Sequence, residues 1–206
     1  MGLAGSSLLH EVAKRILGRY LVTTGASDVI VASALRDEAL GVDLQYTNGA
    51  IRRSAKVKAD SYFGVDPIKI ADRSLSYYRA ETHSYGLESV ADTATRQPGW
   101  LQRSQADDLL YYRLVIGQPE DRVAELFEAP DVRFFAELAV ERDNLHIIPM
   151  QSLRTWFERV QDRYAPRPVM TDGRSAWYRI VTAGDLECEV PGVREVGSVY
   201  HRVVAR

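Results

Sequence analysis

The segment from residue 41 to residue 63 constrains the fold most, because it has the pattern of two short strands joined by a tight turn. Apolar and polar residues alternate from Val42 to Tyr46, which is the period of a half-buried strand. Asn48 and Gly49 follow, and this pair tolerates the positive φ angles that a tight hairpin connection needs. A second alternating run comes next, so the segment predicts an antiparallel hairpin.

The polar faces of these two strands carry the candidate site. Asp43 points away from the apolar side of the first strand, and Lys56 and Lys58 point away from the apolar side of the second. Antiparallel pairing of the strands sets Asp43 near both lysines. We therefore expect the chemistry of the chain at this hairpin, although simple surface ion pairs have the same pattern.

Composition indicates a globular protein. The chain has 206 residues, of which 46% are hydrophobic and 26% charged, and we predict a single domain spanning residues 1–206. No apolar run approaches the roughly 18 residues of a membrane span, and the amino-terminal apolar segment lacks the small-residue cleavage site of a secretory signal. We therefore expect a cytoplasmic protein without membrane contact. The single cysteine, Cys188, is interpreted as a packing residue.

Basic residues gather locally, although the formal net charge of the whole chain is −2. A nucleic-acid-binding protein usually has a basic domain or face, so any such binding must be local here. Basic residues outnumber acidic ones between residues 51 and 80. The basic residues of this stretch are Arg52, Arg53, Lys56, Lys58, Lys69, Arg73 and Arg79, and the acidic ones are Asp60, Asp66 and Asp72.

The remaining pattern mixes strands with helices and predicts an α/β fold. Glu11 lies off the apolar stripe of the first helix, where packing beside the Asp43 strand would aim it at the site. Residues 68–99 lack sustained periodicity and are predicted to form an irregular insertion, and residues 182–206 a C-terminal tail. Helices are predicted at 6–21, 121–127, 134–139 and 151–164, and strands at 28–35, 109–115, 146–150 and 177–181.

The order of these segments, from about Leu8 to Val181, resembles the PD-(D/E)XK nuclease superfamily. The core of that family is a helix, three antiparallel strands, a helix and a further strand, with a metal site at the second and third strands. Its first metal-binding aspartate falls on Asp43, with Val42 in place of the usual proline, and its catalytic lysine falls on Lys58. The resemblance implies a restriction-endonuclease-like three-layer core, with a central mixed β-sheet flanked by helices.

The resemblance also implies a function. Family members hold Mg²⁺, or Mn²⁺ in its place, and hydrolyse DNA phosphodiester bonds. DNA is the expected partner, and RNA is kept as an alternative partner. A homodimer is considered because nucleases of this fold that cut duplexes often act as pairs. The expected nucleic-acid contacts are Arg52, Arg53, Lys69 and Arg79.

One position departs from the family pattern. Lys56 stands where the family has its second acid, although two carboxylates are needed to hold the hard Mg²⁺ ion. Two unit charges 4 Å apart interact by roughly 4 kcal/mol at an effective dielectric near 20, so an ammonium group there repels the metal. A replacement carboxylate could come from Asp60, from Glu11 or from Glu38.

Two functions therefore stay open from the sequence. In the first, Asp43 and either Asp60 or Glu11 hold the metal of a nuclease, and Lys58 lies beside the attacking water. In the second, the fold has lost hydrolysis, Asp43 pairs with Lys56 or Lys58, and the basic face binds a nucleic-acid backbone or a protein partner.

Overall fold

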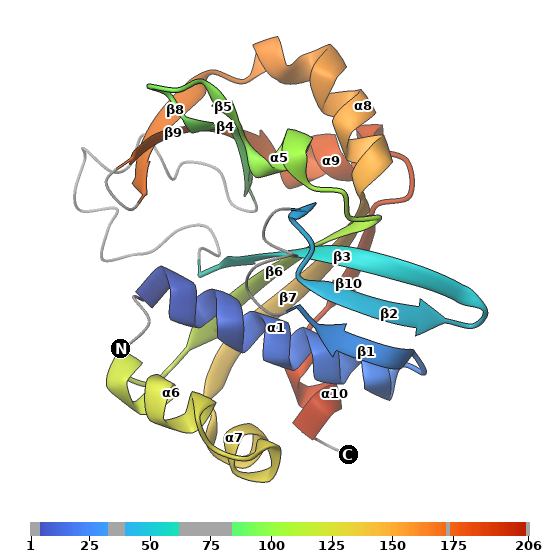
Figure 1. The fold of residues 1–206 in the computed structure, drawn as a ribbon, viewed down its shortest axis with the longest axis vertical. Coiled ribbons are helices and arrows are strands. Elements are labelled where there is room, and N and C mark those ends of the chain that lie inside the picture. The colour runs from blue at the N-terminus through green and yellow to red at the C-terminus, as the bar shows by residue number, and fades with distance from the viewer. Residues whose placement is uncertain (1–4, 33–39, 62–83, 172–173, 205–206) are drawn as a thin grey trace. The chain divides into compact units, whose positions relative to one another are not determined.

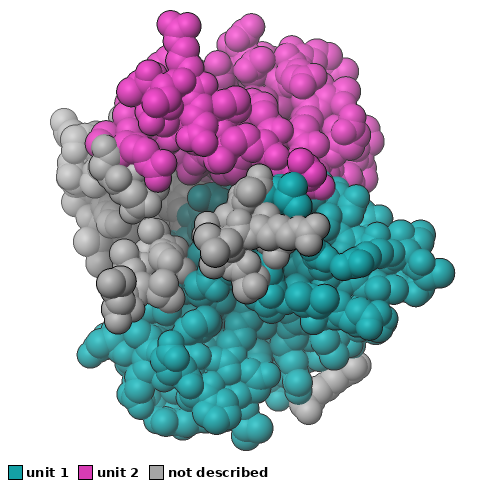
Figure 2. All heavy atoms as spheres, in the orientation of Figure 1, with its two compact units in different colours: residues 1–62, 106–147, 194–206 teal, residues 63–105, 148–193 magenta. Residues whose placement is uncertain are grey.

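The computed structural model describes residues 5–32, 40–61, 84–171 and 174–204. The sequence predicts a single domain, whereas the contacts of the chain divide it into two compact units (Figure 2). Unit 1 comprises residues 1–62, 106–147 and 194–206, and unit 2 comprises residues 63–105 and 148–193. Each unit is therefore built from segments that are far apart in the sequence.

Unit 1 contains a mixed six-stranded sheet, which confirms the predicted α/β class (Figure 1). Strands β1 and β2, and strands β2 and β3, pair in antiparallel fashion, whereas β3 pairs with β6 in parallel. The antiparallel β7–β10 pair completes the sheet. In spatial order the strands are β1 (Ser27–Val31), β2 (Leu44–Asn48), β3 (Ile51–Asp60), β6 (Asp108–Ile116), β7 (Val140–Pro149) and β10 (Arg194–Gly197).

The helices of unit 1 bury their apolar stripes against this sheet. Helix α1 (Gly5–Thr23) confirms the helix predicted at 6–21, and its residues Val12, Ile16 and Leu17 are fully buried in one core with residues of β2, β3 and β6. Helices α6 (Glu120–Phe127), α7 (Asp131–Glu137) and α10 (Tyr200–Val204) contribute to the same core.

No helix in the described part of the chain is long and apolar enough to cross a membrane.

The predicted hairpin is confirmed and sets the register of the candidate site. Asn48 pairs with Ile51 across a two-residue connection, and Gly49 has the positive φ of 61° expected at this turn. Leu44 pairs with Ala55, and both side chains are fully buried. The apolar face was therefore predicted correctly, although the first strand begins at Leu44 rather than at residue 42.

Unit 2 contains a four-stranded antiparallel sheet, where the prediction of an irregular insertion is wrong for the described residues 84–99. A register shift between Glu88 and Val90 interrupts the alternation of β4, which hides the strand from a simple period-2 pattern. In spatial order the strands are β5 (Gln97–Pro98), β4 (Ser84–Asp92), β9 (Arg174–Thr182) and β8 (Pro166–Thr171). The helices are α5 (Trp100–Arg103), α8 (Met150–Val160) with the 3₁₀ turn Gln161–Arg163, and α9 (Ala183–Glu189).

The prediction of a C-terminal tail at residues 182–206 is also wrong, because this segment contributes α9, β10 and α10. In unit 1 the carboxylate of Asp143 on β7 holds the start of α10. It accepts hydrogen bonds from the Tyr112 hydroxyl, the Ser198 hydroxyl and the backbone N–H groups of Val199 and Tyr200. These short elements depend on tertiary contacts, which local sequence patterns do not reveal.

Candidate functional site

Asp43 lies just before β2, inside the sheet of unit 1. Its backbone N–H donates to the Ala55 carbonyl at 2.8 Å, and its carbonyl accepts from the Ala32 N–H at 2.9 Å. These two hydrogen bonds join Asp43 to β3 on one side and to the residue after β1 on the other. The carboxylate is therefore held from a fixed backbone position.

The carboxylate of Asp43 has three partners in the described structure. Oδ2 lies 2.9 Å from the Lys56 ammonium nitrogen and accepts the Val57 N–H at 2.7 Å. Oδ1 lies 3.3 Å from Nε2 of His10, on α1. The side chain thus replaces the next strand carbonyl as the acceptor for Val57, because the ladder between β2 and β3 ends at the Leu44–Ala55 pair.

These contacts decide the ionisation of Asp43. Burial alone raises the pKa of this carboxyl, but the hydrogen bond to His10 and the positive charge and hydrogen bond of Lys56 outweigh burial and hold the pKa at about 2. Asp43 is therefore a carboxylate at neutral pH. Its ion pair with Lys56 leaves little net charge at this position.

The lowered pKa predicts an acid-sensitive contribution to stability. A carboxyl whose pKa is about 2 when folded and 3.8 when unfolded stabilises the protein by about 2 kcal/mol above pH 4, and this contribution is lost as the pH falls through 2. Asp43→Asn should remove it. We expect urea unfolding and hydrogen exchange of the Val57 amide to show a smaller pH dependence between pH 2 and 5 in this variant.

The matched control for this prediction is Asp28→Asn. Asp28 is exposed on β1 and has a φ of 51°, which asparagine tolerates well. The control should keep the acid dependence of the wild type. Equal pH profiles for the wild type and Asp43→Asn would contradict the assigned role of this carboxylate.

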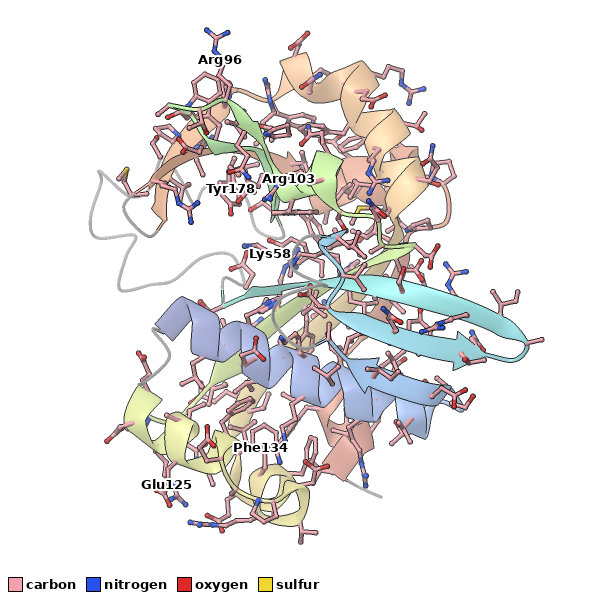
Figure 3. The ribbon with its side chains drawn as sticks, in the orientation of Figure 1. Lys58, Arg96, Arg103, Glu125, Phe134 and Tyr178 are labelled. Atoms are coloured by element: carbon pink, nitrogen blue, oxygen red, sulfur yellow. The ribbon has the colours of Figure 1, made fainter. Side chains whose placement is uncertain are left out.

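Lys58 and Asp60 lie farther along β3. Lys58 is paired in register with Tyr111 on β6, and it projects from the sheet on the side opposite to α1 (Figure 3). Asp60 accepts a hydrogen bond of 2.7 Å from the Tyr111 hydroxyl. Because Asp60 is four residues beyond Lys56, it is displaced by about 13 Å along the strand. The structure therefore does not bring Asp60 to Asp43.

On the first helix, His10 rather than Glu11 contacts the Asp43 carboxylate. The Glu11 carboxylate lies 2.6 Å from the Lys14 ammonium nitrogen. Successive helical residues are about 100° apart around the axis, so neighbouring residues point in different directions. Sequence reasoning missed His10, and the available signal was its position beside Glu11 on a helix expected to pack by the hairpin.

The arginines predicted to contact nucleic acid have different surroundings. The Arg53 guanidinium makes two hydrogen bonds, of 2.8 and 2.9 Å, to the buried Asp108 carboxylate, which also accepts the Tyr46 hydroxyl at 3.1 Å. Burial and the neighbouring Asp108 charge raise the pKa of Tyr46 to about 12.

Arg52, in contrast, is exposed and donates to the Gln45 side chain at 2.6 Å. Lys69, Arg79 and the alternative acid Glu38 lie outside the described residues.

The donor set around Asp43 does not fit a magnesium site. Mg²⁺ favours oxygen ligands in near-octahedral geometry, usually one or two carboxylates with water and phosphate oxygens. Among the described residues, Asp43 belongs to no group of three or more acidic, histidine or cysteine side chains close enough to share an ion. The nearest described charge is instead the Lys56 ammonium, at 2.9 Å.

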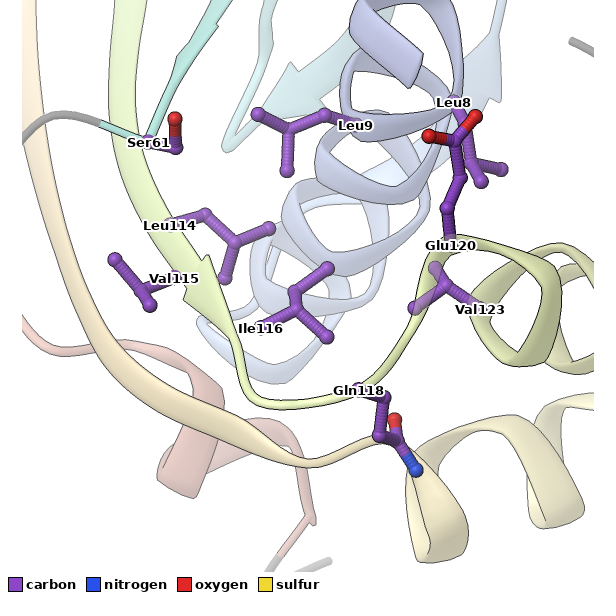
Figure 4. Close-up of a pocket in the computed structure, with 9 residues that line it drawn as sticks. All are labelled: Leu8, Leu9, Ser61, Leu114, Val115, Ile116, Gln118, Glu120 and Val123. Atoms are coloured by element: carbon purple, nitrogen blue, oxygen red, sulfur yellow. The ribbon is translucent and has the colours of Figure 1, made fainter. Parts of the chain in front are cut away.

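Unit 1 also contains an apolar cavity of about 340 Å³, and Asp43 is not among the residues that line it. The lining comes from α1, β6 and α6, with Ser61 at the end of the described part of the hairpin (Figure 4). The residues are Leu8, Leu9, Ser61, Leu114, Val115, Ile116, Gln118, Glu120 and Val123. This lining offers few polar groups for catalysis.

Comparison of the chain with protein-family models, with curated proteins and with solved structures finds no match. The function therefore has to be inferred from the geometry of the site.

Proposed function

We propose that this chain is a nuclease-like module that binds a nucleic-acid backbone without hydrolysing it. The observation that carries the proposal is the 2.9 Å contact between the Lys56 ammonium and the Asp43 carboxylate. The ammonium group of Lys56 therefore occupies the position beside Asp43 at which a nuclease of this family holds a divalent ion. DNA is the proposed partner, and RNA is the alternative to be tested beside it.

The order of the elements supports a relationship to the restriction-endonuclease-like fold. Helix α1 is followed by the antiparallel strands β1, β2 and β3, and β6 then lies parallel to β3. Asp43 precedes β2 and Lys58 lies on β3, which matches the order of acid and lysine in PD-(D/E)XK nucleases. A fold can persist after its original chemistry has been lost, so this likeness is compatible with a binding role.

The cations proposed to contact the backbone lie on β3. Arg52 and Lys58 are six residues apart on the strand and therefore share one face, and Arg52 is exposed. Arg53 is not included, because its guanidinium is bound to Asp108. Lysine and arginine bind phosphates largely by charge, so this contact is independent of base sequence.

Salt dependence tests the proposed contact. The full chain would be titrated with a labelled DNA duplex and with an RNA of the same sequence, in EDTA, at several KCl concentrations. The slope of log affinity against log salt should be negative, and Arg52→Gln or Lys58→Gln should reduce its magnitude by about one, since each removes one phosphate contact. Arg194→Gln is the control, because Arg194 is an exposed arginine on β10 of the same unit. A slope that is unchanged in both variants would refute the contact.

Metal-dependent hydrolysis of DNA is the second candidate function. It is favoured by Asp43 and Lys58, which stand where a nuclease of this family has its first acid and its lysine. It requires a second carboxylate from outside the Asp43 cluster described above, and Mg²⁺ or Mn²⁺ would be its cofactor. A homodimer would be the form expected to cut a duplex.

A further inference from the structure

A hollow of about 280 Å³ lies among helices α1, α7 and α10 of unit 1, which are labelled in Figure 1. Two of its apolar lining residues, Phe135 and Val203, are buried. Two others are exposed, Val132 by 86% and Val204 by 45%. The hollow thus has a buried apolar base and an exposed apolar rim. We call the following lining residues the Val132 patch: Arg19, Asp131, Val132, Phe135, Val203 and Val204.

The apolar residues of α7 explain how the patch forms. Phe134 is fully buried in the core of unit 1, and its ring meets the Phe135 ring edge to face, with the ring centres 5.0 Å apart. Residues three apart on a helix lie on the same side, so Val132 stands beside Phe135 at the surface. An isolated exposed valine is ordinary, but one at the rim of an apolar hollow indicates an interaction surface.

The Val132 patch contains both halves of an apolar contact. Val132 stands out from α7, and the hollow beside it has Phe135 and Val203 at its base. In a dimer with two-fold symmetry the same surface of both copies meets, so a side chain on the rim of each copy can enter the hollow of the other. A second copy of the chain would therefore cover both Val132 side chains at once.

The charges of the patch also suit a second copy. Arg19 is exposed, its guanidinium carbon lies 6.0 Å from the centre of the Phe135 ring, and no carboxylate of the described residues pairs with it. Asp131 is exposed as well, and within the described structure only its Oδ1 is engaged, by Arg15. A two-fold axis can bring the arginine of each copy to the aspartate of the other. With one charge of each sign, the patch has no net attraction for a nucleic-acid backbone.

We infer that the Val132 patch is the centre of a two-fold symmetric interface between two copies of this chain, in which each Val132 enters the hollow of the other copy and each Arg19 faces an aspartate. A stable interface takes about 20–30 residues from each side, so the contact extends over the neighbouring exposed surface of α1, α7 and α10. It is separate from the cations of β3, because Lys58 projects from the side of the sheet opposite to α1 (Figure 3). The inference goes beyond the proposed binding of nucleic acid and does not depend on it.

Sedimentation velocity of the full chain, without nucleic acid and over a wide range of protein concentration, tests this interface. The wild type should pass from monomer to dimer as the concentration rises. Val132→Asp should raise the dissociation constant roughly a hundredfold, because a two-fold interface contains the substitution twice and each buried charge costs about tenfold or more. Circular dichroism should show an unchanged fold, since Val132 is an exposed residue. Ile51→Asp is the matched control, because Ile51 is an exposed apolar residue of the same unit on β3.

A charge exchange tests how the two copies face each other. Arg19→Asp and Asp131→Arg should each dimerise more weakly than the wild type, because each variant places like charges opposite one another. An equimolar mixture of the two variants should associate again, because both contacts then join opposite charges.

Three results would overturn the inference. The first is a wild type that stays monomeric at every concentration, which would leave the patch to a different protein. The second is a dimer that Val132→Asp leaves unchanged or that Ile51→Asp dissociates equally. The third is a mixture of the two charge variants that associates no better than either variant alone.

Discussion

Lys56→Glu is expected to make the stability of unit 1 depend on a divalent metal. The substitution replaces the ammonium group 2.9 Å from Asp43 by a second carboxylate. Without metal, Asp43 loses its cationic partner and gains a like charge, so we expect a loss of about 3 kcal/mol in the free energy of unfolding. With Mn²⁺ at 100 times its dissociation constant, binding should restore about 2.7 kcal/mol.

Lys56→Gln is the matched control for this prediction, because it removes the ammonium without adding a ligand. Unfolding should be followed by hydrogen exchange of the Val57 amide, which donates directly to Asp43. We expect MnCl₂ to slow exchange relative to EDTA in Lys56→Glu, but not in Lys56→Gln or the wild type. A wild-type response that Asp43→Asn abolishes would show that the native site already binds metal.

Gly99→Ala is expected to disrupt unit 2. A Cβ atom at this position would lie 2.5 Å from the carbonyl carbon of Glu88 and 2.9 Å from that of Ser89. Both are backbone atoms of β4, which cannot rotate away as a side chain can. Gly99 also donates its N–H to the Ser89 carbonyl at 3.0 Å. We expect a loss of about 3 kcal/mol, because the strand itself must move.

Tryptophan fluorescence reports this unit selectively, since Trp100, Trp156 and Trp177 all belong to unit 2. Urea unfolding of Gly99→Ala should therefore begin at a lower concentration by fluorescence. Gly184→Ala is the control, because the nearest atom to its added Cβ is 4.0 Å away. If both variants unfold like the wild type, the close approach of Gly99 to β4 is wrong.

The sequence predicted the hairpin and its central contact because both depend on local rules. Alternation identified the buried face, and the turn at Asn48 and Gly49 fixed the register of β2 against β3. That register brings Lys56 to Asp43. The same rules predicted α1, α6 and β6.

Other features depend on tertiary packing and were not predictable in this way. The rotation of α1 decides whether His10 or Glu11 meets Asp43, and the helical stripe alone does not set it to within one residue. The prolines of β8 argue against a strand, although an edge strand such as β8 tolerates them. The short strand β10 likewise depends on pairing with the distant β7.

The most direct test of the account is a cleavage assay on the full chain with labelled single-stranded and duplex DNA and RNA. Wild type and Asp43→Asn would each be incubated with Mg²⁺, with Mn²⁺ and with EDTA under conditions in which the substrate is bound. If Lys56 replaces the metal at Asp43, every substrate should stay intact in all three conditions. Cleavage by the wild type that requires the metal and disappears in Asp43→Asn would contradict the account and identify the chain as a nuclease.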